Sequence, residues 1–375
     1  MTAQLVDRSG EHPVEPELTL AASVRLLVAE PLVFRLRWGI WNFQEATVDL
    51  RGESPAVQQA LGAFLGALAT GAAAPGGFDD APGLSPVERA NLRLVLQELR
   101  QSGFLAYDRP ADRGSDMAKV LLGNLDLYGS APSVDAGVGF FSDAPSAVEY
   151  VSGQTAALGV KVQILPEEFM HELRTADLTS GMGGLAAADA LARLTAHVDQ
   201  CASLVACISR ASVLTLRNLN RLACHLEKPV VVGLIDGPFA TVVGADSPRT
   251  GCLECFEQRS LARLEDHIGY HAFVGAGSAA GTRQPAGGGA NGVESLLCAF
   301  LVNEVVLLRS VDTSRFIGRA LSIYLPTYEM QAQDVLRIAT CPACGHVARD
   351  IAQEINFNSR VVIDRHVRDA LGVAR

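Results

Sequence analysis

The segment TGCLECFEQR, residues 250–259, places Cys252 and Cys255 three positions apart. Two thiols at this spacing are a redox pair, half of a metal site, or a coincidence of sequence. The N-terminal stretch MTAQLVDRSGEHPVEPEL is polar and lacks the basic start and apolar run of a signal peptide. We therefore expect a cytoplasmic protein whose eight cysteines stay reduced, because structural disulfides are rare in that compartment.

A second pair with the same spacing, Cys341 and Cys344, lies in the segment CPACG. Each pair can present two thiolates from a tight turn to one tetrahedral zinc ion. A thioredoxin-like redox motif would follow a strand and open a helix early in its domain, whereas both pairs here end strand-rich segments. The pattern favours a structural zinc site on Cys252, Cys255, Cys341 and Cys344, with a redox pair or no metal as the alternative. The remaining thiols are predicted to be small core residues: Cys201, Cys207, Cys224 and Cys298.

The composition limits the classes of protein to be considered. A chain of 375 residues with 49% apolar residues suggests two or three folded domains. The net charge of −10 argues against a nucleic-acid-binding surface, which would need a basic face. No uncharged apolar stretch reaches about 18 residues, so we expect no membrane span.

Residues 19–112 are predicted to form a small α+β domain after a disordered tail over residues 1–18. Three β-rich segments, VRLLVAE, LVFRLRW and ATVDL, precede two helices whose starts are marked by Ser-Pro. The second helix has a capping box, with Ser85 followed by Glu88. FLAYD then indicates a short strand. This arrangement is typical of a winged helix, although the acidic balance disfavours the DNA binding found in most of them.

Residues 113–350 alternate short apolar strands with helices, which indicates a doubly wound, mostly parallel sheet. Residues 351–375 form a C-terminal extension. The predicted strands are 118–123, 138–142, 160–165, 203–209 and 229–235, followed by a pair at 318–326 and 334–339. The predicted helices are 144–159, 184–200, 214–227 and 293–310.

The stretch SLVACISRASVLTLRNLNRLACHLEKPVVVGLIDGPFATVVGADSPRTGCLECF, residues 203–256, resembles the matching region of E1-like adenylating proteins, the ThiF group. CPACG closes their domain in a similar way. With the winged-helix-like domain in front, residues 20–348 are similar to the cyclodehydratase partner proteins of azole-peptide biosynthesis. The resemblance implies binding of a precursor leader peptide and work beside a YcaO cyclodehydratase that forms azolines on Cys, Ser or Thr. It also implies a homodimer and a flavin-dependent azoline dehydrogenase as a further partner.

The phosphate-binding turn of the family is altered in this chain. An E1-like site needs a Gly-rich turn after its first strand, so that backbone amides reach the phosphates at a helix N-terminus. The corresponding turn, FFSDAPSA at residues 140–147, has no glycine, and Asp143 would place negative charge there. The other candidate, LLGNLDLYG, keeps only Gly123 and Gly129.

Two further nucleotide contacts of the family are also missing. The acid that follows the second strand and binds ribose corresponds to Leu165 or Pro166, with Glu167 nearby. The aspartate that holds magnesium corresponds to Ser209 or Arg210. We therefore expect no ATP binding, and a scaffold without adenylation chemistry. The alternatives are an active adenylating enzyme with an atypical loop, or a zinc-stabilised interaction or regulatory protein.

The leader peptide is expected to add as a strand to the open edge beside ATVDL, with the second helix as the other wall. An ordinary edge strand and a solvated helix face are the alternative interpretation. The predicted contact residues are Ala46, Thr47, Val48, Asp49, Leu50, Asn91, Arg93, Leu94, Gln97 and Arg100. Arg93 and Arg100 would add charged contacts to an acidic leader.

Overall fold

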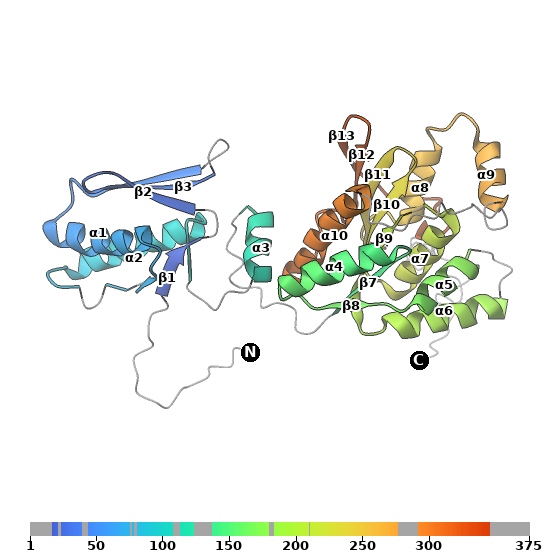
Figure 1. Ribbon diagram of the computed structural model, residues 1–375, viewed down its shortest axis with the longest axis horizontal. Coiled ribbons are helices and arrows are strands. Elements are labelled where there is room, and N and C mark those ends of the chain that lie inside the picture. The colour runs from blue at the N-terminus through green and yellow to red at the C-terminus, as the bar shows by residue number, and fades with distance from the viewer. Residues whose placement is uncertain are drawn as a thin grey trace, which may run out of the picture. The chain divides into compact units, whose positions relative to one another are not determined.

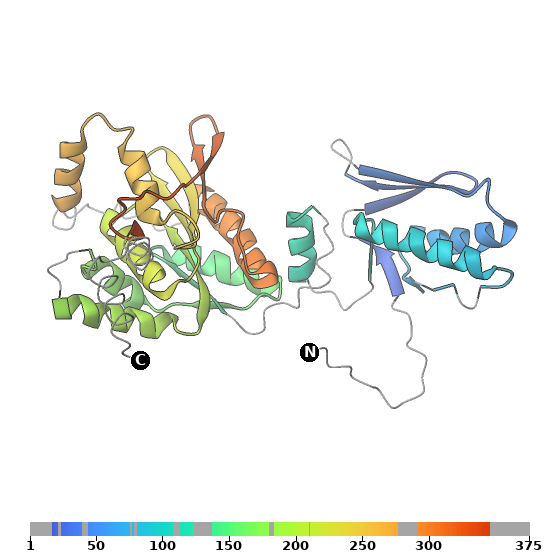
Figure 2. The ribbon, with the colours of Figure 1, turned by 180° about the vertical axis from the view of Figure 1, so that it is seen from behind.

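The computed structural model divides into two compact units, residues 1–130 and 131–375 (Figure 1 and Figure 2). The division falls within the undescribed residues 124–136, whereas the sequence predicts a boundary after residue 112. The structure describes residues 17–21, 24–39, 44–75, 77–78, 81–107, 113–123, 137–179, 184–209, 211–276 and 292–345. The predicted C-terminal extension and all but the last two residues of the predicted N-terminal tail lie outside these ranges.

Within its described residues, the N-terminal unit contains two three-stranded antiparallel sheets and three helices. The first sheet has the order β5 (Ala74–Pro75), β1 (Glu17–Leu20), β6 (Leu105–Tyr107). The second has the order β2 (Val24–Glu30), β3 (Val33–Trp38), β4 (Gln44–Asp49). The helices are α1 (Pro55–Ala69), α2 (Pro86–Gln101) and α3 (Arg113–Leu121).

Local capping explains where α1 and α2 begin, and both predicted starts are confirmed. The Ser54 side chain accepts a hydrogen bond from the Val57 amide at the start of α1. Ser85 and Glu88 form the predicted capping box of α2. The Ser54 hydroxyl also donates to Glu88, which ties the two helix starts together. Hydrogen bonds from Ser54 and Ser85 lower the pKa of Glu88 to about 2.

The predicted strand at 118–123 is wrong, because residues 118–121 belong to helix α3 and residues 122–123 to the turn that follows it. Gly114 and Ala118 are buried whereas Val120 is exposed, which is a helical spacing. A short continuous apolar run such as AKVLL cannot be assigned from periodicity alone.

The C-terminal unit is built on a seven-stranded sheet, which confirms the mixed α/β fold. The sheet order is β13 (Glu329–Asp334), β12 (Arg319–Tyr324), β11 (Phe239–Ala245), β10 (Val230–Asp236), β9 (Cys201–Ile208), β7 (Gly137–Ser142), β8 (Val162–Ile164). The strands β10, β9, β7 and β8 pair in parallel, and β11 to β13 continue as an antiparallel meander. Strand β11 is antiparallel to both β10 and β12, so β12 runs in the same direction as the four parallel strands. Five of the seven strands therefore run in one direction.

Helices cover both faces of this sheet (Figure 1). One face packs against α4 (Pro145–Ala157) and α10 (Gly292–Val311) through a core that includes Phe140, Val151 and Leu301. The other face packs against α5 (Glu167–Thr175), α6 (Gly184–Val198), α7 (Val213–Leu226) and α8 (Leu253–Leu261). A further helix, α9 (His267–Ala276), follows α8. None of the described helices has the length and hydrophobicity that a membrane span requires.

The last hairpin differs from the sequence prediction. Its second strand is Glu329–Asp334, paired so that Tyr324 lies opposite Glu329, and not the apolar segment 334–339. The strand EMQAQD lies at the sheet edge and is mostly exposed, so it carries no hydrophobic pattern. Val335 is instead buried beside the cysteine cluster. The sequence prediction also missed strand β11 and helix α5.

Candidate functional site

The two cysteine pairs lie together in the C-terminal unit. Cys252 is the N-cap of α8, Cys255 lies in its first turn, and the second pair lies in the turns after residue 338. The Sγ–Sγ distances are 3.8 Å for Cys252–Cys255, 3.5 Å for Cys252–Cys341 and 3.4 Å for Cys255–Cys344. All four side chains are buried, and their sulfur atoms lie within 4.8 Å of one another. This arrangement could hold a metal ion.

A close backbone approach brings the two pairs together. A Cβ at Gly251 would lie 2.4 Å from the carbonyl oxygen of Val335, so only glycine fits there. Eight residues later, Arg259 donates from Nε to the carbonyl of Leu336 at 2.9 Å. A Cβ at Gly345 would lie 3.0 Å from the carbonyl oxygen of Ala339. The chain leading to the second pair therefore runs directly beside the first.

Two N–H groups point at the cysteine sulfur atoms. The Ile338 amide donates to Cys255 Sγ at 3.4 Å, and Asn220 Nδ2 donates to Cys252 Sγ at 3.5 Å. Such donors favour the thiolate, which is the form that binds metal. Sequence reasoning missed Asn220, because it is one polar residue within a helical pattern and has no ligand-like spacing.

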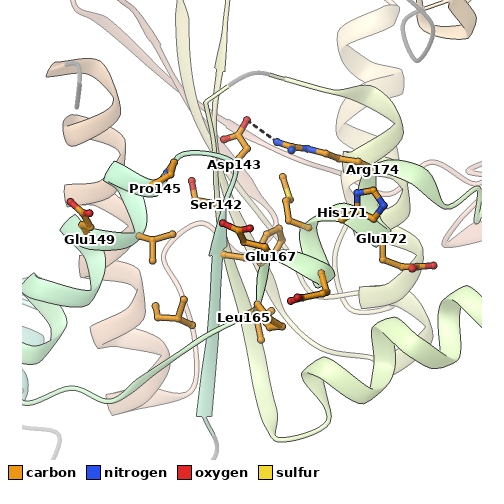
Figure 3. A pocket seen from close by; sticks show the side chains of 15 residues that line it. Ser142, Asp143, Pro145, Glu149, Leu165, Glu167, His171, Glu172 and Arg174 are labelled. Atoms are coloured by element: carbon orange, nitrogen blue, oxygen red, sulfur yellow. Dashed lines mark ion pairs between the residues drawn. The ribbon is translucent and has the colours of Figure 1, made fainter. Parts of the chain in front are cut away.

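A second candidate site lies where the strand order of the large sheet reverses. The chain passes from β7 to β8 on one side and then to β9 on the other, and ligands of α/β sheets bind at such a switch point. An open cavity of about 960 Å³ lies here, at the carboxyl ends of β7 and β8 (Figure 3). Its titratable lining residues are Asp143, Glu149, Glu167, Glu168, His171, Glu172 and Arg174.

Carboxylates occupy the region beside the N-terminus of α4. Asp143 Oδ1 accepts from the Ser209 amide at 2.6 Å, and its other oxygen lies 3.8 Å from Arg174 (Figure 3). Glu294, on α10, accepts from the hydroxyl of Ser209 at 3.1 Å and from the hydroxyl of Ser146. Glu294 is buried, and the Asp143 side chain is only 8% exposed. Negative charge of the protein itself therefore lies at the helix terminus where a phosphate would bind.

The residues compared with the ribose-binding acid follow strand β8, and one of them, Glu167, lines the cavity (Figure 3). Leu165 lines the cavity and is buried, and its amide donates to the carbonyl of Phe140. Pro166 is the N-cap of α5, and Glu167 begins that helix. The second candidate for the magnesium position, Arg210, lies outside the described residues, as does Gly129.

In the N-terminal unit, β4 is an edge strand of its three-stranded sheet. The Leu50 amide donates to the carbonyl of Leu32 at 2.9 Å, which continues the β3–β4 pairing. Opposite residues in an antiparallel pair alternate between bonded and non-bonded positions. Val48 therefore points its amide toward β3, whereas Thr47 points its amide toward the open edge. The edge donor lies at Thr47 and not at Val48.

The acidic side chains of β4 have arginine partners. Glu45 lies 3.0 Å from Arg37 and 3.8 Å from Arg35, measured between the charged atoms. Asp49 lies 2.6 Å from Arg51, and the hydrogen bond from Arg51 lowers the pKa of Asp49 to about 2. These neighbouring cations offset the negative charge that the strand would otherwise present to an acidic peptide.

The predicted contact residues of α2 differ in their surroundings. Asn91, Arg93, Leu94 and Gln97 are exposed, with Leu94 61% exposed. Arg100 is half-buried; its guanidinium lies 4.8 Å from the ring centre of Tyr107 and donates to that hydroxyl. Ala46 and Val48 pack against the core of the N-terminal unit, and Leu50 is buried in that core. The contact of Arg100 with Tyr107 joins α2 to β6, so Arg100 contributes to the packing of this helix.

No protein-family model and no curated protein sequence matches the chain. Among solved structures, it is similar to a heterocyclase in complex with substrate and cofactor, with a TM-score of 0.53 and 15% identity over 87% of this chain and 39% of that one. The heterocyclase TruD gives a TM-score of 0.53 and 16% identity over 88% of this chain and 43% of that one. The structure of E. coli MccB with ATP gives a TM-score of 0.47 and 14% identity over 88% of this chain and 99% of that one. The chain thus covers less than half of the two heterocyclase chains, and shares their fold.

Proposed function

We propose that the chain is a scaffold that binds the leader of a ribosomally made precursor peptide and presents it to a YcaO cyclodehydratase. The partner enzyme would use ATP to form azolines on Cys, Ser or Thr residues of the core peptide. The observation that carries this proposal is the pair of buried carboxylates, Asp143 and Glu294, beside the N-terminus of α4. They argue that the chain has kept the fold of an adenylating protein without its nucleotide chemistry.

Electrostatics explains why this position matters. A nucleotide binds at a helix N-terminus because the exposed amides and the helix dipole favour negative charge. Here the Ser209 amide and two serine hydroxyls already donate to the protein's own carboxylates. Phosphates at the same place would meet two like charges in a partly buried site, where Coulomb repulsion is stronger than in water.

The isolated protein is expected not to bind ATP with magnesium at micromolar concentrations. Isothermal titration calorimetry of the full chain with Mg-ATP measures this directly. A leader peptide titrated into the same sample provides the positive control for a competent protein. Micromolar affinity for Mg-ATP would contradict the scaffold proposal and favour an active adenylating enzyme.

We further propose that the four-cysteine site holds zinc. A Zn–S bond of about 2.3 Å in a tetrahedron places sulfur atoms about 3.8 Å apart. The observed Sγ–Sγ distances of 3.4, 3.5 and 3.8 Å are close to this spacing. Four thiolates leave no open coordination position, so the ion would be structural. The homodimer and the flavin-dependent dehydrogenase partner stay predictions.

Reconstitution tests the scaffold function. The partner cyclodehydratase, ATP and a full-length precursor are mixed with and without this chain, and water loss from the core peptide is followed by mass spectrometry. We expect rapid cyclisation only with the chain present, because tethering the leader raises the effective concentration of the core peptide. A precursor without its leader is the matched control and should lose this acceleration. Equal rates with and without the chain would refute the scaffold function.

A further inference from the structure

Asn220 lies on α7, away from both cysteine pairs in sequence, yet its side chain hydrogen-bonds with Cys252, Leu253 and Glu254 of the first pair's segment. Its Oδ1 accepts from the amide of Leu253 at 2.9 Å, and also from Cys224 Sγ, one turn later on the same helix, at 3.8 Å. Its Nδ2 donates to Glu254 at 3.1 Å and to Cys252 Sγ at 3.5 Å. The side chain is 1% exposed, so water does not compete for these hydrogen bonds.

These contacts hold the first pair in two ways. The bond from Leu253 fixes the backbone directly after Cys252, at the turn where α8 begins. The bond to sulfur places a partial positive charge beside a ligand atom. Four thiolates around a divalent cation carry a net charge of −2, and burial makes that charge costly unless donors offset it. Asn220 supplies one such donor.

The neighbouring residues keep the amide in this orientation. Glu254 is buried and also accepts two hydrogen bonds from Arg221, at 2.7 and 3.0 Å. Its carboxylate can only accept hydrogen bonds, so it fixes the NH₂ end of Asn220 on its own side. The donor group of Asn220 is therefore directed toward Cys252 by its surroundings.

We propose that Asn220 is a positioning residue that sets the metal affinity of the four-cysteine site. It organises the first cysteine pair before the metal arrives and stabilises the Cys252 thiolate afterwards. Loss of an outer hydrogen bond of this kind typically weakens metal binding about 10- to 100-fold.

The same helix provides a matched control in Asn218. This residue is also fully buried, accepts from the amide of Leu178 at 3.0 Å, and donates to the carbonyls of Leu173 and Ala176 at 2.9 and 2.7 Å. Like Asn220, it accepts from one backbone amide and donates two hydrogen bonds, but its partners belong to α5 and the loop after it. Replacing Asn218 removes comparable buried hydrogen bonds without touching the cysteine cluster.

The experiment compares the full-length wild type with Asn220→Leu, Asn220→Asp, Asn218→Leu and Asn218→Asp. The aspartate variants keep the side-chain volume and an acceptor oxygen but lose the N–H donors, which covers the case in which leucine prevents folding. Affinities for Zn²⁺ and Co²⁺ are measured by competition with a chelator. The thiolate-to-cobalt absorption bands report the ligand geometry, and circular dichroism reports the fold.

Both Asn220 variants are expected to bind Co²⁺ and Zn²⁺ at least tenfold more weakly than wild type, with altered cobalt bands. Both Asn218 variants should lower the unfolding temperature while the cobalt bands and the affinity of folded protein stay within about threefold of wild type. Unchanged metal affinity in the Asn220 variants would overturn the proposal. An equal loss in the Asn218 variants would overturn it as well, because general destabilisation would then explain both.

Discussion

Replacing Cys344 with serine is expected to unfold the C-terminal unit while the N-terminal unit stays folded. A structural zinc ion on four cysteines binds with about 10–16 kcal/mol in small zinc domains, and much of this free energy is folding free energy. Removing one thiolate weakens the ion's hold on segments that lie 89 residues apart in the chain. Few domains are stable by more than about 15 kcal/mol. Losing zinc-binding free energy on that scale is therefore enough to unfold the C-terminal unit.

The location of the cluster explains why the effect should stop at one unit. Cys252, Cys255, Cys341 and Cys344 belong to the core that also contains Val243 of β11 and Leu219 of α7. The N-terminal unit has a core of its own, which includes Leu36, Leu61 and Leu96. Loss of the metal is therefore expected to destabilise only the C-terminal unit, whose core contains the four cysteines.

Three measurements check this prediction. Elemental analysis of protein purified without chelators should give one zinc per chain for wild type and markedly less for Cys344→Ser. Thermal unfolding followed by circular dichroism should show the loss of one transition. Cys298→Ala is the matched control, because Cys298 is equally buried but belongs to the opposite face of the sheet. Wild-type protein without zinc, or a Cys344→Ser variant as stable as Cys298→Ala, would contradict the prediction.

Local signals in the sequence predicted much of the fold. The Ser-Pro starts of α1 and α2 depend on hydrogen bonds within one turn, and the structure has both. Buried parallel strands such as β9 and β10 are continuous apolar runs, which stand out without any partner. The repeated Cys-x-x-Cys spacing indicated which residues could share one ion.

Long-range contacts could not be predicted in this way. Ser146 and Glu294 are 148 residues apart and meet only because α4 and α10 pack on the same face of the sheet. Asn220 and Cys252 are 32 residues apart and meet because α7 and α8 pack on the same face of the sheet. Edge strand β13 is exposed at nearly every residue and carries no hydrophobic alternation, so its position follows only from its pairing with β12.

Replacing Thr47 with proline is expected to weaken binding of the leader peptide about tenfold or more, which corresponds to the loss of one backbone hydrogen bond of about 1.4 kcal/mol. The proposed binding mode adds the leader as a strand beside β4, where the Thr47 amide points to the open edge. Proline removes that donor but breaks no bond to β3, and edge strands tolerate it. Proline at Val48 would instead remove a hydrogen bond within the sheet and destabilise the N-terminal unit.

Fluorescence polarisation of a labelled leader measures these differences. Thr47→Val is the matched control; it changes the exposed side chain, keeps the amide, and should bind like wild type.

Arg93→Glu should weaken binding of an acidic leader mainly through slower association, and the effect should shrink at high salt. Arg100 suits this test less well, because its contact with Tyr107 couples charge to packing. A chain that lacks residues 1–130 should lose binding altogether. Undiminished affinity in that truncated chain would move the peptide site to the large sheet, whereas equal affinities of Thr47→Pro and Thr47→Val would exclude strand addition at β4.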